Sequence, residues 1–342
     1  MAKRMKISSH EEQYESIYSI SDNMEVVRTL NILVIGAGGL GSEIIKNLCF
    51  MGFEHIHIID MDTIELSNLN RQLLFSEKDV GQYKATIAAE TMKNWAPKAQ
   101  LTAHNCRIEE KDMYFYMNFD IIISGLDSIT ARRWINEMIM QIYQQHDMVI
   151  PFIDGGTEGF KGHARVICAG ITGCFECNID MFPPQKTYPI CTLANTPRLP
   201  EHCVQYVLKQ EWQDLRSSEV FDSDNPQHLE WVFQRAKTRA ASFGIDGVTL
   251  FFTLGVAKNI IPAIASTNAI ISAACANEAL KIALALPTLN NFTMYNGESS
   301  VYTYTFVVEK NESCIVCSML TRHMTMTKSS TLQDVLNDLS DL

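Results

Sequence analysis

The stretch NILVIGAGGLG at residues 31–41 decides the fold of this chain. Its first five residues, nearly all apolar, are typical of a strand buried on both faces of a parallel sheet. The glycine cluster behind them leads into a helical pattern over residues 43–51, and a second apolar strand, HIHII, covers residues 55–59. A strand, a glycine turn, a helix and a second strand within about 30 residues predict a βαβ unit.

The same alternation continues along the chain. Helices are expected over residues 84–94 and 128–145, and apolar strands over residues 120–124 and 149–153. Strands that alternate with helices are typical of a parallel sheet with helices on both faces. We therefore expect an α/β fold in which a doubly wound, Rossmann-like sheet forms the main domain.

The pattern changes near residue 181. Residues 182–189 contain three prolines, which remove backbone donors and fix the chain, so no regular structure is expected there. Residues 199–244 are polar with a helical pattern, and Trp212 and Trp231 are expected in a small core. The expected segments are an N-terminal tail and helix at 1–30, the α/β domain at 31–181 and again at 259–318, an inserted helical domain at 182–258, and a C-terminal tail at 319–342.

The composition excludes several classes of protein. The chain has 342 residues, 46% of them apolar, and a formal net charge of −11, which argues against disorder and against a nucleic-acid binder. The most apolar stretch, residues 260–286, contains Glu278 and Lys281, so we interpret it as a buried helix rather than a membrane span. No targeting segment is expected. The chain is predicted to be soluble and intracellular, in the cytoplasm or nucleus, where its cysteines stay reduced.

The glycine cluster fits G-x-G-x-x-G between a strand and a helix, where backbone N–H groups and the helix dipole bind phosphate. Asp60 ends the second strand about 20 residues later, where a carboxylate accepts hydrogen bonds from ribose hydroxyls. The motif predicts a nucleotide site but leaves NAD, FAD and ATP open. The alternative is a glycine turn that only packs the helix on the strand. The candidate glycines are Gly36, Gly38, Gly39 and Gly41.

Two cations and a carboxylate favour ATP among these nucleotides. A triphosphate attacked at its α-phosphorus needs basic residues beyond the ribose carboxylate, because charge builds up on the leaving pyrophosphate, whereas an NAD site does not. Arg71 and Lys84 are the candidates, although each taken alone is more often a solvated side chain. Asp127 follows the strand at 120–124, at the carboxyl edge of the sheet. It is a candidate Mg²⁺ ligand, or else the N-cap of the helix that begins at Ser128.

The chain resembles, over about residues 25–320, the adenylating domain of the bacterial ThiF and MoeB proteins. The eukaryotic ubiquitin-like-modifier activating enzymes share this domain. The resemblance rests on the glycine loop, on SNLNRQ at residues 67–72, on Lys84 and on GLDS at residues 125–128. Because several motifs occur in the same order, the resemblance is specific.

This resemblance implies ATP-dependent adenylation of a C-terminal glycine carboxylate. By position, Asp60 would hold the ribose, Arg71 and Lys84 the phosphates, and Asp127 the Mg²⁺ ion. In that family a further arginine comes from the partner subunit, so the site would be incomplete without a dimer. The other residues assigned to the nucleotide are Asp62, Asn68 and Gln72.

Four cysteines occur as two C-x-x-C pairs, Cys174 with Cys177 and Cys314 with Cys317. Two such pairs supply the four thiolates of a tetrahedral zinc site. The pairs lie far apart in the sequence, so a redox role is the competing interpretation. The related enzymes carry a structural Zn²⁺ bound by such pairs, which favours zinc. The metal would then clamp the chain before the insertion to the chain after it.

Cys191 differs from the other cysteines because it lies in the proline-containing crossover, outside any apolar run. A nucleophilic thiol needs access and a lowered pKa, which loops and helix N-termini provide. Residues 189–203 resemble the catalytic-cysteine segment of the activating enzymes, and Cys191 takes the thioester-forming position. Cys203 is interpreted as structural. Core positions are expected for Cys49, Cys106, Cys168 and Cys275.

Two further segments, residues 129–136 and 153–162, resemble the catalytic subunits of the Nedd/Rub-type modifier activating enzymes. This resemblance implies that a ubiquitin-like modifier is adenylated, forms a thioester with Cys191 and then passes to a conjugating enzyme. It also implies a heterodimer with a homologous, non-catalytic subunit. Arg165 would lie near the modifier's tail, or else be an exposed strand residue.

Other functions are left open. The modifier is of the Nedd/Rub type, ubiquitin itself or another relative. The glycine motif alone favours an NAD- or FAD-dependent oxidoreductase, and a non-catalytic scaffold subunit would lack the phosphate-binding and thiol residues that this chain has. Related subunits continue with a ubiquitin-fold domain that recruits the conjugating enzyme, for which residues 318–342 are too short. We expect that domain to be absent, because the chain is truncated or because it recruits the conjugating enzyme differently.

Overall fold

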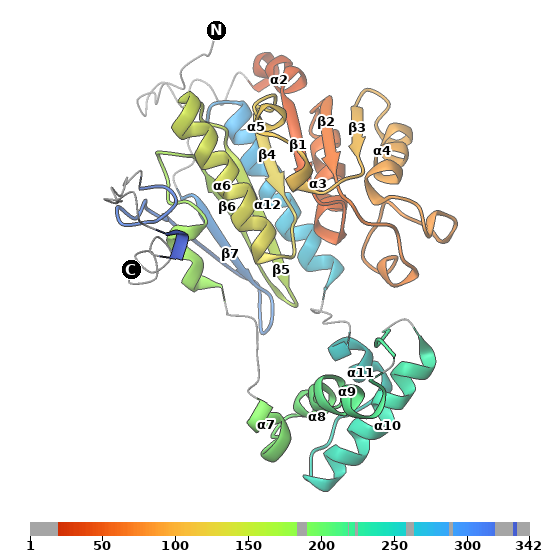
Figure 1. Cartoon of the computed structure of the whole chain (residues 1–342). Coiled ribbons are helices and arrows are strands. Elements are labelled where there is room, and N and C mark those ends of the chain that lie inside the picture. The colour runs from red at the N-terminus through yellow and green to blue at the C-terminus, as the bar shows by residue number, and fades with distance from the viewer. Residues whose placement is uncertain are drawn as a thin grey trace.

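The computed structural model describes residues 20–182, 190–217, 219–222, 225–257, 263–286, 290–318 and 331–333. Of residues 20–23 and 190–192, only the backbone is described. Figure 1 shows a sheet with helices on both faces and, apart from it, a second group of helices.

One mixed sheet holds the strands that fall within these ranges, in the order β3-β2-β1-β4-β5-β6-β7-β8. The strands are β1 (Asn31–Ile35), β2 (His55–Ile59), β3 (Gln100–His104), β4 (Ile121–Ser124), β5 (Phe152–Glu158), β6 (Lys161–Ile167), β7 (Phe292–Asn296) and β8 (Tyr302–Phe306). From β3 to β5 neighbours are parallel, and from β5 to β8 they are antiparallel. The expectation of a parallel sheet is right for the first half and wrong for the second. Only Gly159 and Phe160 separate β5 from β6, and so short a connection joins antiparallel strands.

Helices cover both faces of the sheet. They are α2 (Ile20–Thr29), α3 (Gly39–Phe50), α4 (Lys84–Trp95), α5 (Met113–Tyr116), α6 (Ile129–His146) and α12 (Ala265–Ala283), with short turns η1 (Leu66–Asn68), η2 (Glu77–Asp79), η3 (Ile108–Glu110) and η4 (Glu176–Met181). α3, α4 and α12 share a core with Ile32 and Val34 of β1, whereas α5 and α6 share one with Leu33 and Ile35. Both faces of β1 are buried, which confirms the doubly wound α/β fold.

α12 accounts for most of the apolar stretch at residues 260–286. It packs against α3, β5 and β6, and Ile271 and Cys275 are buried there. Glu278 and Lys281 pair with each other. The interpretation as a buried core helix is confirmed. Within the described ranges, no helix is both long enough and apolar enough to cross a membrane.

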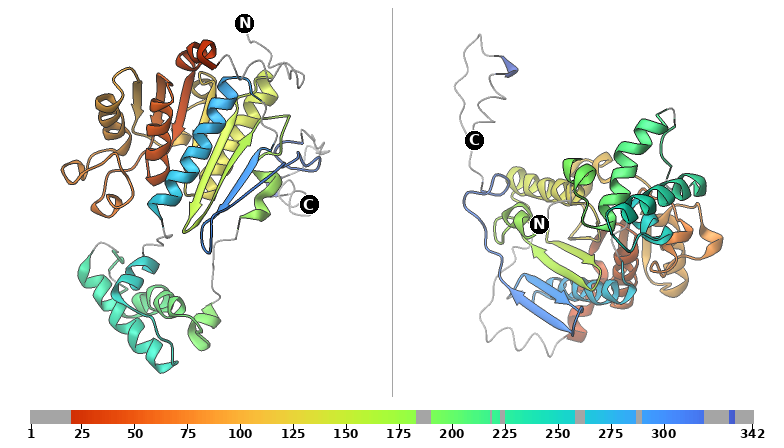
Figure 2. Two further views of the ribbon diagram at one scale, coloured as in Figure 1. Left: turned by 180° about the vertical axis from the view of Figure 1, so that it is seen from behind. Right: turned by 90° about the horizontal axis from the view of Figure 1, so that it is seen from below.

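The second group of helices, called here the helical unit, has a core of its own. Its elements are α7 (Ile190–Asn195), α8 (Pro200–Tyr206), the π-helical turn η5 (Val207–Glu211), α9 (Trp212–Leu215), α10 (Pro226–Ser242) and α11 (Leu250–Ala257). Trp212 is buried in one cluster with Val204 and Val232, and Trp231 is half-buried against this cluster. The core role is confirmed for Trp212 and holds in part for Trp231. Figures 1 and 2 show the helical unit beyond the end of the sheet at which β5 finishes.

Several predicted segments lie outside the described residues. They include most of the tail at 1–30, the proline-containing residues 183–189, and all of the C-terminal tail except residues 331–333. The predicted domain boundaries near residues 182 and 258 adjoin such gaps, so the division into domains stays a prediction.

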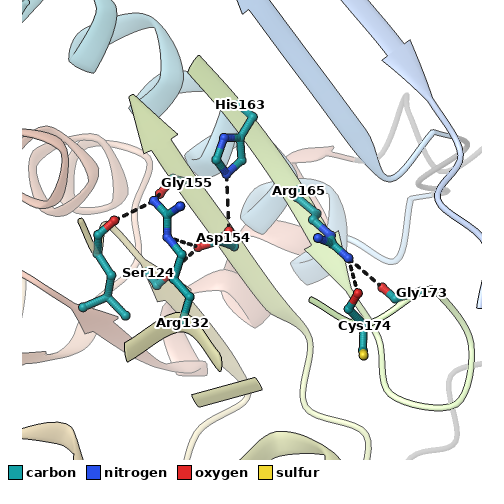
Figure 3. A network of polar contacts seen from close by, with 9 residues as sticks. Ser124, Arg132, Asp154, Gly155, His163, Arg165, Gly173 and Cys174 are labelled. Carbon is teal, nitrogen blue, oxygen red and sulfur yellow. Dashed lines mark hydrogen bonds and ion pairs between the residues drawn. The ribbon is translucent and has the colours of Figure 1, made fainter. Parts of the chain in front are cut away.

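A buried ion pair joins β5 to α6. Asp154 and Arg132 are both buried, and Nε of Arg132 lies 3.3 Å from Oδ1 of Asp154. The Ser124 hydroxyl donates to the same carboxylate at 2.8 Å, and Nε2 of His163 lies 3.3 Å from Oδ2 (Figure 3). Burial by itself raises the pKa of Asp154, but Arg132, His163 and Ser124 more than offset this and lower the pKa to about 2. The carboxylate therefore stays ionised inside the protein.

The substitution Asp154→Asn tests this network. It leaves Arg132 buried without its counter-charge, so we expect the free energy of unfolding to fall by roughly 3–5 kcal/mol at neutral pH. In the wild-type protein the folded-state pKa near 2 lies below the unfolded value of about 3.9. The stabilisation is therefore complete above about pH 4 and is lost as the pH falls toward about 2. Urea titrations should show that the difference in free energy of unfolding between wild type and Asp154→Asn becomes smaller as the pH falls. A difference that does not change with pH would contradict the assignment.

Candidate nucleotide site and metal centre

The glycine loop joins β1 to α3 and closes tightly on itself. Gly36 has a φ of +91°, a conformation that favours glycine. A Cβ on Gly41 would lie 1.9 Å from the carbonyl oxygen of Gly36, so no side chain fits there. α3 begins at Gly39, earlier than the helical pattern over residues 43–51 predicts, because the glycines of its first turn hide that pattern.

The start of α3 is open to an anion. Gly38 is the N-cap, its backbone is extended, and no side chain caps the helix. The first N–H groups of a helix have no partner within it, and the helix dipole adds positive charge there. A Cβ on Gly38 would meet only Nε2 of Gln72, at 3.9 Å. This end of α3 therefore has the geometry that binds a phosphate.

Asp60 stabilises the glycine loop through a hydrogen bond to its backbone. Its Oδ2 accepts a hydrogen bond from the N–H of Ala37 at 2.6 Å, and its Oδ1 accepts one from the N–H of Asp62 at 2.8 Å. Burial raises the pKa of this carboxyl, while the two backbone donors oppose that rise. A carboxylate oxygen can accept more than one hydrogen bond, so Asp60 can still accept bonds from ribose hydroxyls. The ribose role predicted for Asp60 is therefore compatible with this geometry.

Arg71 and Gln72 lie against the glycine loop. A Cβ on Gly39 would come within 3.4 Å of Cγ of Arg71. The guanidinium of Arg71 donates to two neutral oxygens, the carbonyl of Ser67 and Oδ1 of Asn70, so no carboxylate compensates its charge among the described residues. Gln72 is buried, and its Oε1 has no hydrogen-bond partner in the part of the chain that the structure describes. A buried acceptor left without a donor beside the loop fits a ligand that donates to it.

Lys84, at the start of α4, is held by Asp62. Its Nζ lies 2.7 Å from Oδ2 of Asp62, and its side chain is only 10% exposed. Because Asp60 binds the N–H of Asp62, this cation is linked to the glycine loop. Asn68 has a local role, since its Oδ1 accepts the N–H of Glu65 at 3.0 Å and caps η1. The roles of these residues toward a nucleotide stay predictions.

Asp127 lies at the same edge of the sheet. The turn after β4 packs on the glycine loop, since a Cβ on Gly36 would lie 3.2 Å from the carbonyl oxygen of Gly125. The N-cap of α6 is Ser128, whose Oγ accepts the N–H of Ala131 at 3.4 Å. The alternative in which Asp127 caps this helix is therefore wrong. The Asp127 carboxylate is exposed and bonds to no residue that the structure describes, which leaves it free to bind Mg²⁺.

Two residues that support the glycine loop were not predicted from the sequence. Asn268 on α12 is buried, and a Cβ on Gly39 would come within 2.5 Å of its Nδ2. Oγ1 of Thr157 donates to Oδ1 of Asn268 at 2.7 Å. The available signal is an amide within an apolar helix, which needs a partner when buried. Together these residues support the loop from the side of α12.

The structure brings the two C-x-x-C pairs together. Their four Sγ atoms lie within 4.8 Å of one another. The separations of 3.6 Å between Cys174 and Cys314 and 3.4 Å between Cys177 and Cys317 are too long for disulfide bonds. They are close to the ~3.8 Å between thiolates in a tetrahedral zinc site. The cluster is compatible with zinc and argues against the redox interpretation.

Cys191 is the second residue of α7. Its side chain lies outside the described residues, so its role as a nucleophile stays a prediction. Cys203 is fully buried in α8, and burial raises the pKa of its thiol, so it is a poor nucleophile. Of the four cysteines expected in the core, Cys49 and Cys275 are buried. The other two, Cys106 and Cys168, are half-buried.

Arg165 on β6 has no exposed surface, so the expectation of an exposed strand residue is wrong. Its guanidinium donates to the carbonyl oxygens of Gly173 and Cys174, next to the cysteine cluster (Figure 3). It therefore supports the turn that carries the first C-x-x-C pair. A contact with a modifier's tail stays a prediction, and it requires this side chain to turn outward.

Known proteins resemble this chain over most of its length. A family model described as ThiF family matches residues 10–316. The chain is 52% identical over 322 residues to the NEDD8-activating enzyme E1 catalytic subunit of Dictyostelium discoideum. This match covers 90% of this chain and 73% of that protein. It is 47% identical over 333 residues to the Drosophila melanogaster protein of the same name, covering 94% and 74%. A crystal structure of E. coli MccB with ATP shares the fold, with a TM-score of 0.54 and 18% identity over 86% of this chain and 69% of that one.

Metal content and thermal stability test the cysteine cluster. We expect about one zinc ion per chain in protein purified without chelator, and loss of most of it in Cys314→Ser. Because the metal joins segments 140 residues apart, the same substitution should lower the midpoint of thermal unfolding by several degrees. Cys106→Ser, at a half-buried cysteine outside the cluster, should change neither value. Full zinc content in Cys314→Ser would overturn the assignment.

Proposed function

The chain belongs to the ThiF family, and from this premise we propose that it is a catalytic subunit that activates a ubiquitin-like modifier of the NEDD8 type. Two relatives, 52% and 47% identical to it, carry the name NEDD8-activating enzyme E1 catalytic subunit. The resemblance to the Nedd/Rub-type activating enzymes is thereby confirmed.

One arrangement in the structure carries the proposal. The turns after β1, β2 and β4 meet at one edge of the sheet. Arg71 lies against the open start of α3, Lys84 pairs with Asp62 in the segment after β2, and Asp127 follows the turn that packs on the glycine loop. Backbone N–H groups and cations suit phosphates, and a free carboxylate suits Mg²⁺, which would neutralise phosphate charge when bound. An NAD site has no need of these two cations. The combination therefore favours ATP.

In the proposed first step, a carboxylate oxygen of the modifier's C-terminal glycine attacks the α-phosphorus of ATP. A bond forms between this oxygen and the phosphorus, the bond from the phosphorus to the bridging oxygen of pyrophosphate breaks, and pyrophosphate leaves with the electron pair. Arg71 and Lys84 are assigned to the charge that builds up on the leaving group. Asp60 is assigned to the ribose. Asp62, Asn68 and Gln72 complete the proposed site.

In the proposed second step, the thiolate of Cys191 attacks the acyl carbon of the adenylate. A carbon–sulfur bond forms, the bond from this carbon to the phosphate oxygen breaks, and AMP leaves with the electron pair. The thiol's proton passes to solvent. Two steps replace one difficult step, because a free carboxylate is a poor electrophile and AMP is a good leaving group.

The proposal includes three protein partners. The modifier is the substrate, a conjugating enzyme receives it from the thioester, and a homologous non-catalytic subunit completes the nucleotide site with an arginine. The described cysteines form no disulfide, which fits the reducing cytoplasm or nucleus that we propose as the location. A structural Zn²⁺ bound by the four clustered cysteines completes the set of cofactors.

Other functions have less support. Activation of ubiquitin or another modifier would use the same residues, so the choice of the NEDD8 type rests on the named relatives. An NAD-dependent oxidoreductase accounts for the glycine loop and Asp60 but leaves Arg71, Lys84 and Asp127 without a role. A non-catalytic scaffold accounts for none of these residues.

The first step is tested by exchange of pyrophosphate into ATP. In Asp127→Asn we expect the exchange rate to fall by at least about tenfold, because the substitution removes a proposed Mg²⁺ ligand. Glu137→Gln, an equally conservative change at an exposed position of α6, is the matched control and should exchange normally. Normal exchange in Asp127→Asn at limiting Mg²⁺ would refute the assignment.

The second step is tested by a thiol-labile adduct with the modifier. Cys191→Ala, assembled with the partner subunit and supplied with ATP and NEDD8, should form no such adduct while it continues to exchange pyrophosphate. Cys203→Ala removes the buried neighbouring thiol and should still form the adduct. The nucleophile assignment is wrong if these two variants behave the other way round.

A further inference from the structure

Asn268 is a buried amide near the start of α12. It is the fourth residue of that helix and is only 2% exposed. Its Oδ1 accepts the hydroxyl hydrogen of Thr157, near the end of β5, at 2.7 Å. A side-chain amide carries its acceptor and its two donors on different sides of one planar group, so this bond also decides where Nδ2 points.

The donor side of this amide faces the glycine loop. A Cβ on Gly39 would lie 2.5 Å from Nδ2 of Asn268, so the amide nitrogen adjoins the backbone of Gly39. Nδ2 donates to no atom in the part of the chain that the structure describes. It is not fully enclosed, so a ligand atom can reach it. Buried polar groups are rarely left without a partner, and an idle donor at this place indicates a ligand that accepts from it.

The backbone that Nδ2 adjoins is the end of α3 that attracts anions. Gly38 is the N-cap and Gly39 the first residue of α3, and no side chain caps the helix. A second amide lies beside Gly38, since a Cβ there would meet Nε2 of Gln72 at 3.9 Å. The start of the helix therefore presents backbone N–H groups together with two side-chain amides. A phosphate group has several charged oxygens and can accept from such a set of donors.

We propose that Asn268 is a phosphate-binding residue, whose Nδ2 donates to an oxygen of the ATP phosphate bound at the start of α3. The inference rests on the proposed function, since it takes ATP as the ligand. Asn268 adds a donor from α12, whereas Arg71, Lys84 and the backbone donors come from the segments after β1 and β2. Because it is uncharged, it orients the phosphate without adding to the positive charge of the site. Thr157 acts through Asn268 and is a positioning residue for the amide.

Binding of ATP and of adenosine separates a phosphate contact from a general change in the site. Both are titrated calorimetrically, with Mg²⁺ present, into the full chain assembled with its partner subunit. In Asn268→Asp the side chain keeps its size and an acceptor for Thr157, but it loses the donor and brings a negative charge to the phosphate. We expect the Kd for ATP to rise at least about tenfold, and the Kd for adenosine, which has no phosphate, to stay within about twofold of wild type.

Two further variants frame this result. Thr157→Val removes the hydroxyl that orients the amide and keeps the branched shape, so the Kd for ATP alone should rise by about threefold. Asn277→Asp is the matched control, because it makes the same chemical change at an exposed position of α12. Its Kd values for both ligands should equal those of wild type.

The inference is overturned by an unchanged Kd for ATP in Asn268→Asp. It is also overturned by an equal rise in both Kd values, which indicates a purely structural role. Thermal unfolding without ligand shows whether each variant is folded. Asn268→Ala, which removes the donor without adding charge, replaces Asn268→Asp in the comparison if the latter does not fold.

Failure of the proposed function gives a different result. The wild-type protein would then bind ATP but, when supplied with NEDD8, would neither exchange pyrophosphate nor form the thiol-labile adduct. The comparison of ATP with adenosine in Asn268→Asp needs neither of these reactions, so it tests the phosphate contact separately.

Discussion

The close approach of α3 to the end of β1 is the constraint on which the rest of the structure depends. One methyl group on Gly41 would overlap the carbonyl oxygen of Gly36, so the helix starts this near the strand only where side chains are missing. The same closeness lets Gly125 pack on the loop and lets Asp60 reach the N–H of Ala37. Three turns that are far apart in the sequence therefore meet at one edge of the sheet.

Local patterns were sufficient for strands buried on both faces and insufficient for the others. β1 and β4 are almost wholly apolar, β2 contains three isoleucines, and their own residues indicate these strands. β3, QLTAH, is a partly exposed edge strand without a clear pattern. β6, KGHARVI, contains two polar residues with distant partners. His163 bonds to Asp154, and Arg165 donates to the carbonyl oxygens of Gly173 and Cys174. Such partners come from other segments of the chain, so no local pattern reveals them.

The candidate site divides in the same way. A glycine motif and two C-x-x-C pairs are defined by residue type and spacing, so they can be located in the sequence alone. Asn268 and Arg132 are defined by what they reach: Asn268 contacts the glycine loop from α12, and Arg132 donates to the carbonyl of Leu126 at 2.6 Å, beside Asp127. Arg165 shows the opposite error, because a charged side chain suggests exposure and this one is buried among carbonyl oxygens.

The cysteine cluster leaves the inserted helices free to change during evolution. Its two pairs are 140 residues apart, one before the helical unit and one after β8, so a metal ion there closes a loop that contains the whole insertion. The entropy of closing a loop grows only with the logarithm of its length, by about 0.6 kcal/mol for each doubling. Helices of the helical unit, which has a core of its own, can be lengthened, lost or exchanged with little effect on the sheet. The unit that carries Cys191 is in this sense a replaceable module, and its partners can diversify while the sheet and its glycine loop stay the same.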